Sequence, residues 1–473
     1  MSAGSTPAIR LSLTADMILA RPRSQEICAN SMTPPFKTIK EIDHGGFAKV
    51  YLVEGSDGKH YALKALEPAS LLLQSVPIQD LKRRFVREAT YQESINHPNV
   101  VPVLHVDTST EPPFYVMPLA DGSLAKDLAA DHTLSGAPKH ALFEILAGLE
   151  HISEKGFVHR DLKPANVLKF STGTGADRYA ISDFGLMNPG DVDTTTLTVT
   201  GAKGGTELYA APELMVDFSR ATTAADIYSF GAILHDIFVA QPRIPYTQLS
   251  AAGPIGPIIE RCTKTNPRRR YKSIAELRED LFNVLDTAPP TFHSGHEQRA
   301  AELLQSSSDL TSDQWDEVLM ALDENDDKGI RNDDLLRTLR NEHFAQLNVD
   351  SPELVKSLGL RFCDFVMERS FDFDYCDILS SRLEAIYEVG DTELKAITIL
   401  AFLELGTSHN RWLVERNFYR RVLNDASPNL IQRFITEAKV RDYSLAKKIA
   451  HINRSITVDT AKYHPFLIAA LAK

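Results

Sequence analysis

Residues 159–166 read HRDLKPAN, and seventeen residues after Asn166 the triplet DFG begins at Asp183. The carboxylate of Asp161 is a candidate base, because it can accept the proton of a substrate hydroxyl. Lys163 lies two residues farther on, where its ammonium group can reach a phosphate. Asn166 and Asp183 supply the hard oxygen ligands that Mg²⁺ prefers. Together these side chains suit phosphoryl transfer, which requires mainly positioning, charge neutralisation and a base.

Further motifs lie on both sides of this stretch. The motif YALK ends at Lys64, and its apolar residues indicate a buried strand. The motif FVREA contains Glu88, nine residues before the triplet HPN. Downstream, residues 205–213 read GTELYAAPE. With these motifs in this order, the chain resembles a eukaryotic-like (Hanks-type) Ser/Thr protein kinase over about residues 36–286.

The resemblance implies a role for each main site residue. Asp161 and Lys163 would be catalytic, and Asn166 and Asp183 would bind Mg²⁺. Lys64 would hold the α- and β-phosphates of ATP. The other nucleotide-site residues that the resemblance implies are Glu88, Gly45, Gly46, Val50, Ala62, Met117, Ala120 and Leu168.

Glu88 is the expected partner of Lys64 in an ion pair, as the resemblance implies. The alternative is a solvated glutamate, because the same predicted helix carries several basic residues. These are Lys82, Arg83, Arg84 and Arg87. The position of Glu88 relative to Lys64 and to the HPN triplet favours the ion pair.

The predicted phosphate loop departs from the family's pattern G-x-G-x-x-G-x-V. Gly45 is kept and Gly46 is an additional glycine, but Asp43 and Ala48 replace the first and third glycines. Glycine allows the backbone to approach a phosphate closely, and Asp43 brings negative charge towards the triphosphate. We therefore expect weakened ATP binding unless the Asp43 side chain points outward.

The segment FYVMPLA, which ends at Ala120, is the expected hinge. The resemblance makes Met117 the gatekeeper, the Pro118 carbonyl an acceptor for adenine and the Ala120 N–H group a donor. Proline has no N–H group, but the family uses only the carbonyl at that position.

Later motifs are expected to support the catalytic loop. The resemblance pairs Glu213 with Arg270 in a buried salt bridge, and it makes Asp226 the brace of the catalytic-loop backbone. Lys163 after HRDL, together with Thr206, favours Ser/Thr specificity over tyrosine specificity.

Arg160 suggests control by phosphorylation, because an arginine at this position often pairs with a phosphate on the activation loop. Five threonines lie between Gly185 and Gly205, namely Thr194, Thr195, Thr196, Thr198 and Thr200. We predict autophosphorylation within this cluster. The alternative is a polar loop with no regulatory role.

Composition limits the class of protein. At 473 residues the chain suits two or three domains, and 43% apolar with 24% charged residues is typical of a globular protein. A net charge of −12 argues against nucleic acid as a general partner. Four widely spaced cysteines indicate neither a zinc site nor a disulfide framework. The same cysteine pattern fits a reduced, cytoplasmic setting. No apolar run reaches the roughly 20 residues that span a bilayer.

Beyond residue 286 no family resemblance is evident. Residues 287–296 are the predicted linker, and residues 297–473 have the patterning of an all-helical domain. One helix should carry Leu394, Ile397, Ala401 and Leu405, and its other faces are also apolar, which predicts burial. Another should begin at Pro428.

The acidic stretch at residues 323–329 invites interpretation as an EF-hand. Lys328 occupies the sixth position, where a calcium loop needs glycine, and shifting the register places Leu335 at the twelfth. An acidic turn between helices is the better interpretation.

The predicted fold is therefore α+β: a two-lobed protein kinase at 36–286, preceded by an extension at 1–35 and followed by an all-α domain at 297–473. The expected function is ATP- and Mg²⁺-dependent transfer of phosphate to Ser or Thr of a protein. The helical domain is expected to dock a partner or substrate, or to regulate the kinase domain. Asp43 and Ala48 leave open a pseudokinase scaffold. A small-molecule kinase is disfavoured by the APE motif ending at Glu213.

Overall fold

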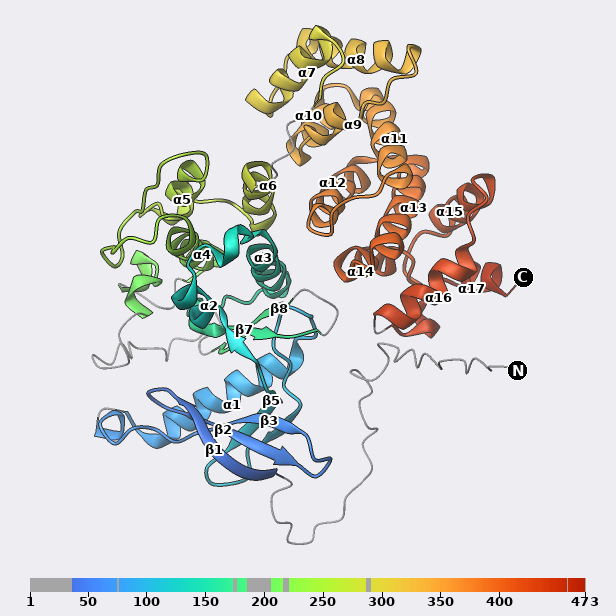
Figure 1. Cartoon of the computed structure of the whole chain (residues 1–473). Helices are drawn as coiled ribbons and strands as arrows, with labels where there is room; N and C mark the ends of the chain where they lie inside the picture. The colour runs from blue at the N-terminus through green and yellow to red at the C-terminus, as the bar shows by residue number, and fades with distance from the viewer. Residues whose placement is uncertain are drawn as a thin grey trace, which may run out of the picture.

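A computed structural model describes residues 36–74, 76–172, 177–184, 206–215, 221–285, 291–456 and 458–472. Figure 1 shows a small lobe of strands, a larger helical lobe and a further region of helices beside the larger lobe. The predicted two-lobed fold with an appended all-helical region is confirmed. The predicted threonine cluster between residues 194 and 200 and the extension at 1–35 lie outside the described residues.

The small lobe is a five-stranded sheet in the order β1-β2-β3-β5-β4, antiparallel throughout. Helix α1 (Ile78–Ser94) follows β3 and buries Leu81, Phe85 and Glu88. In register, Ala62 of β3 lies opposite Met117 of β5. The strands are β1 (Phe36–His44), β2 (Lys49–Gly55), β3 (His60–Ala65), β4 (His105–Asp107) and β5 (Phe114–Pro118).

The large lobe is mainly helical, with a small antiparallel sheet β6-β7-β8 on the side that faces the small lobe. Its central helices α3 and α4 are apolar on most faces and correspondingly buried. The helices are α2 (Leu124–Ala130), α3 (Lys139–Glu154), α4 (Thr223–Phe238), α5 (Gly256–Cys262) and α6 (Ile274–Leu285). The strands are β6 (Gly122–Ser123), β7 (Val167–Phe170) and β8 (Arg178–Ile181).

Short 3₁₀ turns connect several of these elements. They are η2 (Leu72–Gln74), η3 (Leu134–Gly136), η4 (Pro164–Asn166), η5 (Thr206–Leu208), η6 (Pro212–Met215), η8 (Pro267–Arg269) and η9 (Thr460–Lys462). Residues 241–255 form no helix.

Beyond the large lobe the described chain is helical. The helices are α7 (Gly295–Ser306), α8 (Ser312–Asp327), α9 (Asp333–Arg337), α10 (Asn341–Asp350), α11 (Pro352–Glu368), α12 (Tyr375–Val389), α13 (Thr392–His409), α14 (Trp412–Arg421), α15 (Pro428–Val440), α16 (Leu445–Ser455) and α17 (Pro465–Leu471). Helix α13 is the central one, and the burial predicted for it is confirmed on every face. Among the described residues no helix combines the length and apolar character needed to cross a bilayer.

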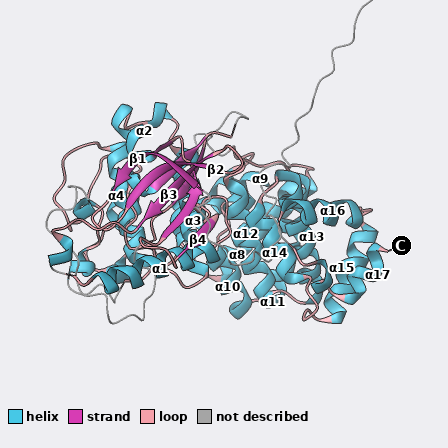
Figure 2. Ribbon diagram, turned by 90° about the horizontal axis from the view of Figure 1, so that it is seen from below, coloured by secondary structure: helices cyan, strands magenta, loops and turns pink. Residues whose placement is uncertain are grey.

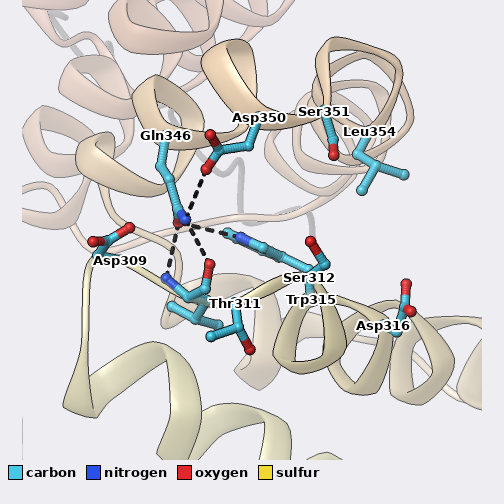
Figure 3. A pocket seen from close by; sticks show the side chains of 10 residues that line it. Asp309, Thr311, Ser312, Trp315, Asp316, Gln346, Asp350, Ser351 and Leu354 are labelled. Carbon is cyan, nitrogen blue, oxygen red and sulfur yellow. Dashed lines mark hydrogen bonds between the residues drawn. The ribbon is translucent and has the colours of Figure 1, made fainter.

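One sequence detail of this region has a direct structural counterpart. The acidic stretch 323–329 is the end of α8 and the turn after it, where Gly329 has a positive φ of 66°. Trp315 of α8, Gln346 of α10 and Leu354 of α11 line a hollow of about 450 Å³. Figure 3 shows these side chains. The hollow is far along the chain from the predicted site motifs and shares no residue with them.

The helical region and the large lobe form one continuous hydrophobic core. Phe282 of α6 stacks on Tyr375 of α12 with ring centroids 4.8 Å apart. Figures 1 and 2 both place α12 and α14 near this lobe, while α15–α17 lie farther out. The region therefore packs against the large lobe, in addition to being joined to it through the predicted linker.

Buried charges also cross this junction. Arg278 of α6, which is 1% exposed, pairs with Glu150 of α3 at 2.5 Å and lies 3.7 Å from Asp377 of α12. Asp377 in turn accepts a hydrogen bond from Nε of Arg411 at 2.7 Å. Burial alone would raise the pKa of Asp377, but Arg411 and Arg278 lower it below its ordinary value. The two parts of the chain therefore depend on each other for charge neutralisation.

A second buried carboxylate, Glu415 of α14, predicts a pH dependence of stability. Its side chain is fully buried, with one oxygen 3.0 Å from Nε2 of His451. Burial raises its pKa to about 7, although Ser455 and Arg416 act in the opposite direction. Since the pKa is raised on folding, the folded state binds the extra proton between about pH 5 and 7. The unfolding free energy should therefore fall over that range, by at most about 3 kcal/mol, and level off above it.

Denaturant titrations at pH 5, 6, 7 and 8 check this expectation by comparing the native chain with Glu415→Gln. The difference isolates Glu415 from His451, whose pKa is lowered by burial and whose effect on stability has the opposite sign. The exposed Glu353 of α11 provides the control variant Glu353→Gln. Equal pH dependence in all three proteins would contradict the expectation.

Candidate active site

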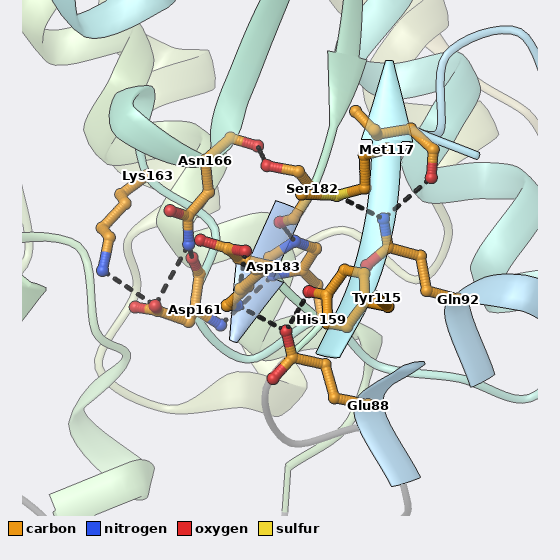
Figure 4. A network of polar contacts seen from close by, with 12 residues as sticks. Glu88, Gln92, Tyr115, Met117, His159, Asp161, Lys163, Asn166, Ser182 and Asp183 are labelled. Atoms are coloured by element: carbon orange, nitrogen blue, oxygen red, sulfur yellow. Dashed lines mark hydrogen bonds and ion pairs between the residues drawn. The ribbon is translucent and has the colours of Figure 1, made fainter. Parts of the chain in front are cut away.

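Lys64 lies at the centre of an ion-pair cluster beneath the small-lobe sheet. Its Nζ is 2.6 Å from Oε1 of Glu88 in α1 and 2.8 Å from Oδ1 of Asp183 after β8. Tyr115 of β5 donates its hydroxyl hydrogen to the same Glu88 oxygen at 2.8 Å. The predicted ion pair between Lys64 and Glu88 is therefore present. Figure 4 shows Glu88 with the hydroxyl group of Tyr115 beside its carboxylate.

The charged forms of Lys64 and Asp183 are favoured in this cluster. Desolvation would lower the pKa of Lys64, but Asp183 and Glu88 raise it well above its ordinary value. Desolvation would raise the pKa of Asp183, but Lys64 and then Lys163 lower it. A cation fixed between carboxylates in this way is suited to holding phosphate oxygens.

The catalytic loop brings together the other predicted residues. Nζ of Lys163 is 2.8 Å from Oδ2 of Asp161. Asn166 donates from Nδ2 to the Asp161 carbonyl at 2.8 Å and to its Oδ2 at 3.1 Å. These contacts fix the Asp161 carboxylate beside an ammonium group, where a substrate hydroxyl and a phosphate could meet (Figure 4).

Asp226 of α4 binds the backbone of this loop, as the sequence predicts. Its two oxygens accept the backbone N–H groups of His159 and Arg160, each at 2.8 Å. Burial raises the pKa of Asp226, although His159 and the two backbone donors oppose that shift. The brace links the catalytic loop to a central helix of the large lobe.

Two residues of the site have the left-handed backbone that non-glycine residues rarely adopt. Arg160 has φ 66° and Asp183 has φ 61°. Such conformations cost about 1–3 kcal/mol each and persist only where the surroundings enforce them. Around Arg160 the brace from Asp226 does this, and beside Asp183 the fully buried Phe184 packs near the His159 ring at 5.0 Å.

The predicted adenine-side residues come from both lobes. Val50 of β2 lies opposite Lys64 of β3 in register. Met117, Ala120 and Leu168 belong to one apolar cluster. Leu168 reaches it from β7 in the large lobe, so the cluster includes residues of both lobes at the hinge.

The structure shows the surroundings of the residues at which the predicted phosphate loop departs from the family's glycine pattern. Asp43 is exposed and accepts the backbone N–H of His44 at 2.8 Å, so one of its oxygens is engaged locally. Gly46 has open space around it, as a phosphate contact requires. Ala48, which replaces a glycine, is 3% exposed and packs with the α1 side of the small lobe, while Phe47 lies 5.6 Å from the Lys64 ammonium.

Tyr115 and Gln92 belong to this network but were not identified from the sequence. Gln92 of α1 is fully buried and donates to the Val101 carbonyl at 2.8 Å and to the Met117 sulfur at 3.7 Å. The spacing of each residue from a predicted site residue could have indicated it. Gln92 is one helical turn after Glu88, and Tyr115 shares a strand face with Met117.

The activation-segment end is anchored as predicted. The guanidinium of fully buried Arg270 binds both oxygens of Glu213, at 2.7 and 2.8 Å. Gly185 and Gly205, which delimit the predicted phosphorylation loop, and the side chain of Thr206 lie outside the described residues.

The donor set fits magnesium and a nucleotide together. Among the described residues no cluster of three or more His, Cys, Asp or Glu side chains could hold a metal ion by itself. An amide oxygen from Asn166 and a carboxylate from Asp183 leave most positions of an octahedral ion to water and phosphate. The basic Lys64 and Lys163 suit the same phosphates.

Comparison with known proteins agrees with this geometry. The family profile described as "Protein kinase domain" matches residues 36–299. The chain is similar to Serine/threonine-protein kinase PknB of Mycobacterium leprae, with 32% identity over 235 residues, covering 44% of this chain and 36% of that protein. It is similar to Serine/threonine-protein kinase PknD of Chlamydia pneumoniae, with 29% identity over 299 residues, covering 54% and 31%. A third relative, Serine/threonine-protein kinase PknJ of Mycobacterium tuberculosis, has 32% identity over 222 residues, covering 46% and 36%.

The matched stretch thus spans about a third of the length of each of these relatives. The resemblance drawn from the motifs is confirmed. The profile match extends thirteen residues beyond the predicted boundary at 286 and reaches into α7.

Proposed function

Because the chain belongs to the protein kinase family, we propose that it transfers the γ-phosphate of ATP to serine or threonine hydroxyls of proteins. The observation that carries this proposal is the buried Lys64–Glu88 ion pair, with Asp183 beside it. A kinase needs this pair in place for phosphotransfer. The intact pair favours an active enzyme over a nucleotide-binding scaffold.

The site residues divide the chemistry among them. Asp161 would orient the substrate hydroxyl and take its proton, and Lys163 would stabilise charge on the transferred group. Lys64, fixed by Glu88, would hold the other phosphates. Bound ATP supplies the phosphoryl group, and Mg²⁺ held by Asn166 and Asp183 would neutralise its charge.

Incubation of the full chain with radiolabelled ATP and Mg²⁺, with and without a mixture of protein substrates, tests this proposal. We expect label on Ser and Thr, and none with Asp183→Asn, which lacks the metal-binding carboxylate. Label on small molecules only, or equal label with the variant, would contradict it. If ATP and Mg²⁺ raise the melting temperature of the native chain but no label is transferred, the pseudokinase alternative is favoured.

The same experiment addresses the proposed autophosphorylation. We expect label within the cluster Thr194, Thr195, Thr196, Thr198 and Thr200, because Arg160 could pair with a phosphate there. Fully active enzyme with all five threonines unmodified would contradict this part of the proposal.

We also propose that the helical region contributes to docking of a partner or substrate, or to regulation. Residues 241–255, where the family has a docking helix, form a helix-free segment. Since the region shares its core with the large lobe, a chain ending near residue 290 would expose buried residues such as Phe282. Surface variants of the full chain are therefore the appropriate test of docking.

A further inference from the structure

Helix α14 of the helical region touches the loop that follows α1 of the small lobe. Arg416 donates a hydrogen bond from Nη2 to the backbone carbonyl of Asn96 at 2.7 Å, across 320 positions of the sequence. One turn later, Arg420 lies 3.4 Å from Glu154 at the end of α3. The two arginines thus cross the same junction but contact different lobes.

The loop that Arg416 contacts connects α1 to the large lobe. Its start is bonded to α1 through Ile95, whose N–H group donates to the Gln92 carbonyl. Its end is bonded to β8, because the Asn99 carbonyl accepts the Ile181 N–H at 2.9 Å. Between them the His97 ring stacks on His151 of α3, with centroids 4.7 Å apart.

The position of this loop affects the site because Glu88 lies less than two turns before the end of α1. A shift of α1 as a unit at its carboxyl end would displace Glu88 relative to Lys64. The Lys64–Glu88 distance is 2.6 Å, and a displacement of about 1 Å would exceed hydrogen-bonding distance. A contact that fixes this loop can therefore influence the ion pair.

Arg416 is suited to that control. Its guanidinium lies just beyond the carboxyl end of α1, where the helix dipole favours a cation, and the Asn96 carbonyl that it binds is two residues past the last helical residue. It also lowers the pKa of His151, after the larger effect of burial, and that of His97, after the larger effects of burial and of His151. The contact thus joins α14 to the loop after α1, and the His97 ring of that loop stacks on His151 of α3.

We propose that Arg416 is a positioning residue of the active site. By holding the Asn96 carbonyl it fixes the carboxyl end of α1 and keeps Glu88 within reach of Lys64. The helical region is then part of the device that assembles the ion pair, and a partner that moves α14 changes phosphotransfer. This proposal rests on the proposed kinase function.

Three variants of the full chain separate positioning from general support of the fold. Arg416→Ala removes the loop contact, Arg416→Lys keeps a cationic donor, and Arg420→Ala removes the neighbouring cross-junction pair. With saturating ATP and protein substrate, Arg416→Ala should lower kcat about tenfold, as expected for loss of a charged hydrogen bond. The KM for the protein substrate should stay within about twofold, because the change acts on a small-lobe helix.

The two control variants complete the kinetic comparison. Arg416→Lys should recover most of the native kcat, and Arg420→Ala should stay within about twofold of it. Equal losses for Arg416→Ala and Arg420→Ala would overturn the proposal, because both would then act only by weakening the junction.

A double-mutant cycle tests whether Arg416 acts through Glu88. In a Glu88→Gln background, Arg416→Ala should lower kcat by less than about twofold. The reason is that both changes act on the same ion pair, between Lys64 and Glu88. A full tenfold additional loss would overturn the proposal.

Hydrogen exchange over residues 78–94, measured without ATP, gives a readout that is independent of activity. Arg416→Ala should increase exchange towards the end of α1, and Arg420→Ala should not. If neither the native chain nor any variant phosphorylates a substrate, the proposed function fails. The exchange comparison alone then decides whether Arg416 positions α1. Identical exchange in the native chain and Arg416→Ala overturns that positioning role.

Discussion

Replacing Asp161 with asparagine is expected to lower the rate of phosphotransfer by about 10²- to 10⁴-fold, the range for loss of a catalytic base. Asparagine keeps the shape and one acceptor oxygen, so the contact with Lys163 at 2.8 Å can persist. Lys64, Glu88 and Asp183 do not contact the Asp161 side chain in the hydrogen bonds of the described site. The variant should therefore bind ATP and Mg²⁺ with nearly native affinity but transfer phosphate very slowly.

Two measurements separate these effects. Initial rates of protein phosphorylation report the chemical step, and the rise in melting temperature with ATP and Mg²⁺ reports nucleotide binding. Asp57→Asn, in the exposed turn between β2 and β3, makes the same chemical change away from the site and should leave both unchanged. A rate for Asp161→Asn within threefold of the native rate would exclude Asp161 as the base.

The site could be predicted from the sequence because each motif is short and its chemistry is local. HRDLKPAN, with DFG at Asp183, predicts a candidate base, a candidate phosphate contact and candidate metal ligands, and the structure brings these side chains together. Lys64 and Glu88 are 24 positions apart, yet the strand and helix that carry them were evident. The large lobe followed from the same resemblance.

What could not be predicted depends on contacts between distant parts of the chain. Arg278 has no local sign of burial, and its ion pairs with Glu150 and Asp377 are separated by 128 and 99 positions. Arg416 likewise reads as a surface arginine of an amphipathic helix. Periodicity predicts which helix faces are buried but not which helix lies against them. The sequence therefore predicts a helical domain after a linker but not that this domain shares the core of the large lobe.

This shared core has a consequence for stability, and Asp377 is the place to measure it. Asp377→Ala is expected to lower the unfolding free energy by about 3–5 kcal/mol, the range for breaking a buried ion pair by removing one partner. Arg411 and Arg278, which are 7% and 1% exposed, would lose a buried counter-charge. Arg278 would keep Glu150, but Arg411 would lose both of its bonds to a carboxylate.

Because the network crosses the junction, the loss should appear as destabilisation of the large lobe and the helical region together. Denaturant unfolding followed by tryptophan fluorescence reports the helical region, since Trp315 and Trp412 both lie there. ATP-dependent activity measured along the same titration reports the kinase lobes. We expect both midpoints to shift by equal amounts in Asp377→Ala.

A matched variant distinguishes the buried network from ordinary surface pairs. Asp323, which is 63% exposed and pairs with Arg361, allows the control Asp323→Ala in the same region. That change should cost less than about 1 kcal/mol, because water already screens the pair. If Asp377→Ala costs no more than Asp323→Ala, the junction charges do not hold the two parts together. If only the fluorescence midpoint shifts, the helical region unfolds independently, and a change in α14 cannot be transmitted to Glu88 through a shared fold.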